Sequence, residues 1–119
     1  MKGAARGLLE RLRERRPQKH EQHEKMRSFY AQFEAAYWYL GEALKRGDRY
    51  LLIHSASDLV LYGGRLILAH NRMLYPFHKW LMTEVARAPE KPANFMSLVE
   101  ALFETPNRDN AKAFYDCVM

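Results

Sequence analysis

Residues 21–45 read EQHEKMRSFYAQFEAAYWYLGEALK, and their apolar side chains recur at steps of three and four positions. Steps of this size place side chains on one face of an α-helix, which turns once every 3.6 residues or so, about 100° per residue. The stretch therefore predicts one long amphipathic helix, whose apolar face is formed by Met26, Phe29, Tyr30, Phe33, Tyr37, Leu40 and Leu44.

The rest of the chain repeats this helical pattern between turn residues. Gly47-Asp48 ends the first long helix, and Gly63-Gly64 inside the next one indicate a close approach between helices. No segment alternates with a period of two for long enough to form a strand. The sequence predicts an all-α, up-and-down bundle of about five helices with short loops. The expected helices cover residues 21–45, 49–72, 76–87, 94–104 and 108–119.

The net charge of +5 is confined to the beginning of the chain. Nine Lys or Arg and four Glu occur in residues 1–27, and the other 92 residues carry no net charge. We therefore divide the chain into a basic helical leader, residues 1–25, and a bundle domain, residues 26–119, which we expect to belong to a longer protein. Within the leader, residues 3–15 predict a short amphipathic helix that ends at Pro17. The leader is interpreted as a solvated connection or, alternatively, as an arm that touches RNA or an acidic protein.

The composition also indicates in which cellular compartment the protein is expected. Cys117 is the only cysteine, so an internal disulfide is excluded and a reducing compartment is expected. No continuous apolar stretch reaches the roughly 18 residues that a membrane span needs. We therefore expect a cytoplasmic protein without a membrane partner.

Common catalytic motifs are missing from the sequence. It has no D-x-D pair, no Gly-Ser turn and no Walker loop for metal and phosphate, and its aspartates are scattered. His20, His23 and Glu24 have one-turn spacing but lack a fourth metal ligand. Neither Cys117 nor any serine has the surroundings of a nucleophile. The sequence therefore predicts no catalytic residue, metal or cofactor on this chain.

One polar pattern is notable in the second predicted helix. Asp58, Arg65 and Arg72 recur every seven residues, and His54 lies one turn before Asp58 on the same face. Residues 70–81, HNRMLYPFHKWL, then bring donors and aromatic rings to the corner at Pro76. Two interpretations stay open: salt-bridged surface groups with core aromatics, or a site for an anion or a flat ring.

Residues 70–89, HNRMLYPFHKWLMTEVARAP, resemble the corner in the C-terminal helical domain of bacterial nucleotidyltransferase-fold proteins, including the aminoglycoside nucleotidyltransferases. The resemblance covers residues 27–115 and is most specific over residues 70–81. It implies an N-terminal α/β domain that binds ATP or another NTP with Mg, and a helical domain that covers the acceptor substrate. This chain has only the helical part, so the resemblance implies a non-catalytic substrate-binding and dimerisation domain. The expected binding residues are Asp58, Arg65, Asn71, Arg72, Tyr75, His78, Lys79 and Trp80.

Two other functions remain as alternatives. The bundle is also similar to HEPN-type ribonucleases, in which an Arg precedes a His on one helix, and Arg65 with His70 fits that spacing. His70 would then act as general acid or base and Arg65 would stabilise the phosphate, in a dimer. A helical adaptor that binds another protein through an exposed apolar face is the second alternative. A homodimer is expected in any case, because the many aromatic residues exceed what a short bundle covers alone.

Overall fold

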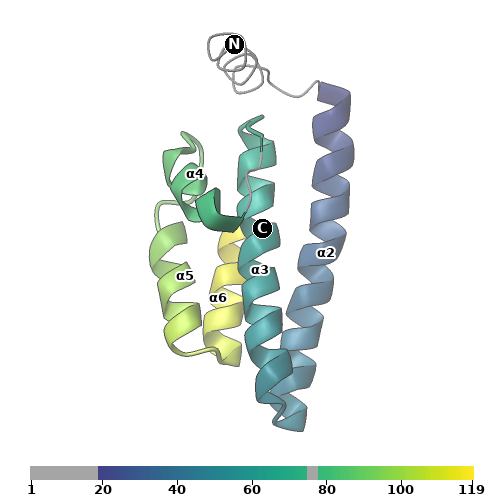
Figure 1. Cartoon of the computed structure of the whole chain (residues 1–119), viewed down its shortest axis with the longest axis vertical. Helices are drawn as coiled ribbons and strands as arrows, with labels where there is room; N and C mark the ends of the chain where they lie inside the picture. Colours follow the sequence, from purple (N-terminus) through teal and green to yellow (C-terminus); the bar gives the residue numbers. More distant parts are fainter. Residues whose placement is uncertain (1–18, 75–77) are drawn as a thin grey trace, which may run out of the picture.

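The computed structural model describes residues 19–74 and 78–119, with side chains from Glu24 onward. In these ranges the chain forms five α-helices and one short 3₁₀ helix and contains no strand (Figure 1). The all-α bundle expected from the sequence is confirmed. The helix expected over residues 3–15 lies outside the described residues. The elements are α2 (Lys19–Arg46), α3 (Arg49–His70), η1 (His78–Trp80), α4 (Leu81–Arg87), α5 (Phe95–Glu104) and α6 (Arg108–Val118).

The two longest helices, α2 and α3, form an antiparallel hairpin. Gly47 makes the turn with a φ of 66°, a conformation that suits a residue without a Cβ. Asp48 then caps α3, because its Oδ1 accepts a hydrogen bond of 3.0 Å from the backbone N–H of Leu51. α6 packs against both hairpin helices, α5 packs on α6, and α4 packs on α3 (Figure 1).

Aromatic rings fill the centre where α2, α3, α5 and α6 meet. The ring of Phe114 lies 6.2 Å from that of Phe33 and 5.3 Å from that of Phe95, and all three are fully buried. A Cβ on Gly63 would lie 2.8 Å from Cζ of Phe114, and a Cβ on Gly64 would lie 3.3 Å from a methyl of Val85. The close helix approach that the two glycines predicted is therefore confirmed.

A polar contact joins α2 to α6 beside this core. The hydroxyl of Tyr115 donates a hydrogen bond to the carboxylate of Glu34, and the Tyr115 ring stacks 4.4 Å from that of Tyr37. This hydrogen bond, together with partial burial, raises the pKa of Tyr115 well above its usual value near 10. The phenol therefore stays protonated and the contact persists throughout the physiological pH range.

Two helix boundaries differ from those expected. α3 ends at His70 rather than residue 72, because the backbone of Arg72 turns into the left-handed region with a φ of 56°. The helix expected over residues 76–87 appears as η1 followed by α4, and residues 75–77 are outside the described part. α4 ends at Arg87, where the Lys91 ammonium donates to the carbonyls of Ala86 and Ala88 at 2.9 and 2.8 Å.

α3 is both long and apolar. By length and composition alone it reaches what a membrane-crossing helix needs, which the sequence expectation did not anticipate. Half of its apolar window is buried inside the bundle. The core helix of a globular protein meets the same criterion.

Candidate functional site

The candidate site is built where α3 ends, because most of the residues singled out in the sequence lie there. The N–H of Met73 donates to the carbonyl of Leu68 at 2.9 Å, and the N–H of Arg72 donates to Ala69 at 3.0 Å. With Arg72 in the left-handed conformation, these bonds form a Schellman motif, which commonly ends a helix. The chain leaves α3 abruptly at this point.

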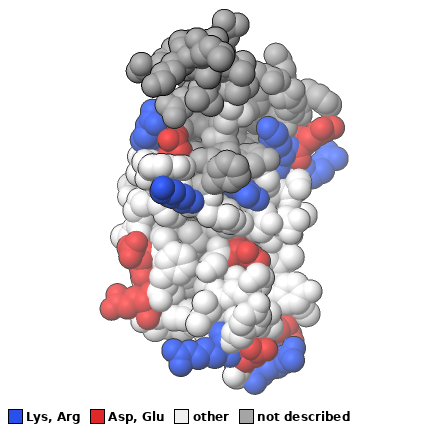
Figure 2. Space-filling view, viewed as in Figure 1, with Lys and Arg blue, Asp and Glu red and all other residues white. Residues whose placement is uncertain are grey.

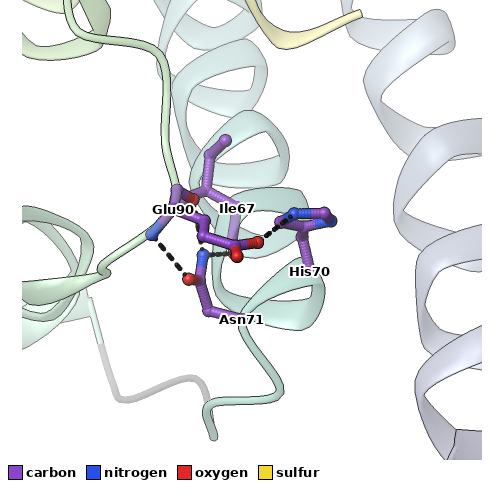
Figure 3. A network of polar contacts seen from close by, with 4 residues as sticks. All are labelled: Ile67, His70, Asn71 and Glu90. Carbon is purple, nitrogen blue, oxygen red and sulfur yellow. Dashed lines mark hydrogen bonds and ion pairs between the residues drawn. The ribbon is translucent and has the colours of Figure 1, made fainter.

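Asn71 fastens this helix end to the loop between α4 and α5. Its Nδ2 donates to the carbonyls of Ile67 and Glu90, both at 2.7 Å, and its Oδ1 accepts from the N–H of Glu90 at 2.8 Å. Figure 3 shows Glu90 held in this way from its backbone, while its carboxylate reaches His70. We call Asn71, His70 and Glu90 the corner clamp. It fixes two segments that are about twenty residues apart in the sequence.

A cavity of about 410 Å³ lies beside the corner clamp. His70 and Glu90 form part of its rim, with Nε2 of His70 at 2.9 Å from Oε2 of Glu90. The rest of its wall is mainly apolar and includes Met26, Tyr30, Leu66, Ile67, Val118 and Met119. Its size and lining suit the apolar part of a small ligand.

Replacing Asn71 by alanine should test the corner clamp. The substitution removes three hydrogen bonds and leaves the Glu90 amide without its acceptor. Because the clamp is only partly buried, we expect the free energy of unfolding to fall by about 1–2 kcal/mol. Urea denaturation measures this change. Asn94→Ala is the matched control, since Asn94 makes no side-chain cap hydrogen bond, and equal losses for the two variants would contradict the clamp.

The corner continues into η1, whose three residues are all exposed. The ammonium of Lys79 lies 5.2 Å from the centre of the Trp80 ring, a cation–π contact that holds both side chains at the surface. His78 precedes them, and Tyr75 is outside the described residues. The corner thus presents cationic groups and a flat ring to solvent.

The other expected binding residues lie further along α3. Asp58 borders a groove between α2 and α3, and its Oδ2 lies 3.2 Å from Nε2 of His54. The guanidinium of Arg65 lies 5.6 Å from the ring of Phe29 and 5.4 Å from that of Tyr62. At about 1.5 Å per residue, Asp58 and Arg72 are about 21 Å apart along the helix. The seven expected residues that the structure describes therefore follow α3 and its corner rather than lining a single pocket.

The two residues of the ribonuclease alternative contact different elements. Arg65 faces the rings on the α2 side, whereas His70 is bound to Glu90 on the loop side. No group of three or more His, Cys, Asp or Glu suited to a metal occurs among the described residues. The side chains of His20 and His23 lie outside them. Burial raises the pKa of the Cys117 thiol to about 11, so it is protonated at neutral pH.

Sequence reasoning missed two important features of the site. Glu90 lies in a loop, and nothing in its neighbourhood in the sequence indicates a contact with Asn71. The left-handed backbone of Arg72 was missed as well, although an asparagine followed by the end of a helical pattern could have signalled a helix C-cap.

Comparisons with known proteins add no relative to this picture. No protein-family model matches the chain, and neither a curated protein nor a solved structure gives a significant match.

Proposed function

We propose that this chain is the non-catalytic, helical substrate-binding and dimerisation domain of a nucleotidyltransferase-like protein. In this proposal the acceptor substrate binds at the exposed corner formed by Arg72, His78, Lys79 and Trp80. A catalytic domain elsewhere in the intact protein would hold ATP or another NTP with Mg. The resemblance of residues 70–89 to such domains supports the proposal, and so does the all-α bundle.

The observation that carries the proposal is the residue at position 72. A left-handed position after a helix is usually glycine, and another residue there costs about 1 kcal/mol. Here it is an exposed arginine at a φ of 56°. Backbone strain of this kind gathers at functional sites, where a particular side chain is needed despite the cost. We therefore assign Arg72 a binding role.

The neighbouring groups define the chemistry of the ligand. An arginine guanidinium forms paired hydrogen bonds with phosphate or carboxylate oxygens, and Lys79 adds a second positive charge. The exposed face of Trp80 suits a flat ring. The corner therefore suits a ligand that joins an anionic group to a planar ring.

Substitution of Arg72 by glycine should raise stability while it weakens binding. The free energy of unfolding should rise by about 1 kcal/mol, because glycine tolerates the left-handed backbone. Adenosine 5′-monophosphate serves as a probe with an anion and a ring, and its binding is followed by quenching of Trp80 fluorescence in a Trp38→Phe background. We expect at least a tenfold loss of affinity in Arg72→Gly.

Arg87→Ala is the control for this experiment, because Arg87 is an exposed arginine on α4 that pairs with Glu84 at 3.1 Å. It should leave the affinity for the probe unchanged. Unchanged binding in Arg72→Gly, or no quenching at millimolar probe, would contradict the substrate-binding proposal. We prefer this proposal to ribonuclease activity because Arg65 and His70 contact different elements.

A further inference from the structure

We infer that the hollow between α2 and α6 binds a small planar aromatic molecule that carries a carboxylate or another anionic group. We call this hollow the α2–α6 groove; it lies along the second half of α2 and the first turn of α6. The corner is at the far end of α3 from the hairpin turn, and the 22 residues of α3 span about 33 Å. The inference therefore concerns a separate site and does not depend on the proposed function.

Small residues on both helices make room for the α2–α6 groove. Gly41 of α2 and Ala111 of α6 line it, together with the apolar side chains of Leu40 and Leu44. Its volume is about 300 Å³. An apolar cavity of roughly 150 Å³ is already large enough to hold benzene. The groove therefore has room for a ligand of one or two fused rings.

Gly41 is not explained by packing among the described residues. Glycine weakens the interior of a helix, and the two glycines of α3 are offset by close contacts, Gly63 with Phe114 and Gly64 with Val85. A Cβ on Gly41, in contrast, would have nothing within 4 Å. Because Gly41 lines the groove, any side chain there would occupy part of it. Its absence lets a flat molecule lie directly against the backbone of α2.

Aromatic side chains beside Gly41 suit a flat ring. The ring of Trp38 is 60% exposed and meets that of Tyr39 edge-on, with their centres 5.0 Å apart. Tyr37, which also lines the groove, stacks on Tyr115 of α6 at 4.4 Å. Each lining ring is thus held by a neighbouring ring, and groups that are held in advance lose less entropy when a ligand binds. An aromatic ligand can stack on the exposed ring of Trp38.

Both carboxylates of the α2–α6 groove already have partners. Figure 2 shows side chains of both signs at the lower end of the molecule, where the hairpin turn lies in Figure 1, so pairing matters more than net charge. The carboxylate of Glu34 accepts a hydrogen bond from the hydroxyl of Tyr115. The carboxylate of Glu42 lies 3.5 Å from the ammonium of Lys45. These contacts reduce the attraction of the groove for a cationic ligand.

Arg108 supplies the positive charge on the α6 side of the groove. Its side chain is exposed and forms no hydrogen bond or ion pair with any residue that the structure describes. A guanidinium forms paired hydrogen bonds with a carboxylate, which is why we infer an anionic group on the ligand. The ring would lie over Gly41 and beside Trp38, with its anionic group directed to Arg108.

Titration of the full chain with 2-naphthoate, a bicyclic aromatic carboxylate, tests the inference. In a Trp80→Phe background Trp38 is the only tryptophan, so its indole N–H gives a single peak in a ¹H–¹⁵N NMR spectrum. We expect this peak to move and to reach saturation at millimolar probe. A peak that does not move, or that never saturates, would overturn the inference.

Gly41→Leu should weaken the binding of 2-naphthoate at least tenfold, because the leucine side chain fills the space over α2. The variant should fold, since leucine favours helix more than glycine does and its Cβ meets no other atom. Ala31→Leu is the matched control, because it adds leucine at an exposed position of α2 outside the groove and should leave the affinity unchanged. Full affinity in Gly41→Leu would place the ligand elsewhere and overturn the inference.

Arg108→Gln tests the anionic group, because it removes the charge and keeps a long polar side chain. We expect the affinity for 2-naphthoate to fall several-fold, whereas Arg87→Gln, at an exposed arginine on α4 that pairs with Glu84, should leave it unchanged. The probe 2-naphthylmethylammonium has the same rings and the opposite charge, and it should bind more weakly. Tighter binding of this cation, or unchanged affinity in Arg108→Gln, would overturn the inferred ligand class.

Discussion

Phe114→Ala is expected to lower the free energy of unfolding by about 3–5 kcal/mol, the usual cost of deleting a buried aromatic ring. Phe114 is 0% exposed and contacts the rings of Phe33 and Phe95, so its removal leaves a cavity between three helices. Urea denaturation gives the value directly. Phe114→Leu, which keeps most of the volume, supplies the measurement if the alanine variant does not fold.

Phe103→Ala is the matched control for this substitution. Phe103 lies on the neighbouring helix α5 but is 46% exposed, so it loses less buried area on truncation. We expect it to cost about 1 kcal/mol. A loss at Phe114 no larger than that at Phe103 would show that α6 is not packed as described.

Gly63→Val should be the most damaging change in α3. A Cβ at this position would already lie 2.8 and 2.9 Å from two atoms of Phe114 and 3.2 Å from Phe33. Both rings are fully buried and cannot move away cheaply, so added methyl groups should cost about 1–3 kcal/mol or more in strain. Thermal and urea denaturation measure the loss.

Gly41→Ala separates this steric effect from helix propensity. A Cβ on Gly41 would have no atom within 4 Å, so alanine there should stabilise α2 by about 0.5–1 kcal/mol. If Gly63→Ala stabilised the protein as much as Gly41→Ala, this would contradict the close contact between Gly63 and Phe114 of α6. We expect Gly63→Ala to lower the free energy of unfolding, because its Cβ would press on the Phe114 ring. Adding Phe114→Leu should recover part of that loss, because the smaller side chain leaves room for the Cβ.

The fold could be predicted from the sequence because it depends mainly on local patterns of apolar and turn residues. The spacing of apolar residues identified α2, and Gly63 and Gly64 correctly indicated close packing. Turn residues bounded the helices to within a few positions. The exception is the corner, where η1 replaces the first part of the helix expected from Pro76.

The candidate site could be predicted less well, because its contacts join segments that are distant in the sequence. The seven-residue repeat put Asp58, Arg65 and Arg72 on one helix face, but periodicity does not limit how far such a face extends. The partner of Asn71 is Glu90, and a loop residue has no periodic pattern to reveal it. The backbone conformation of Arg72 depends on the helix end that forms around it.

The corner clamp also determines how the molecule comes apart locally. Helix ends and loops normally open separately and at little cost, because few contacts hold them. Here the amide of Glu90 and the last turn of α3 share one side chain, Asn71. Fraying of α3 must therefore release the loop as well. The end of one helix and a loop twenty residues later therefore open together, as a single cooperative unit.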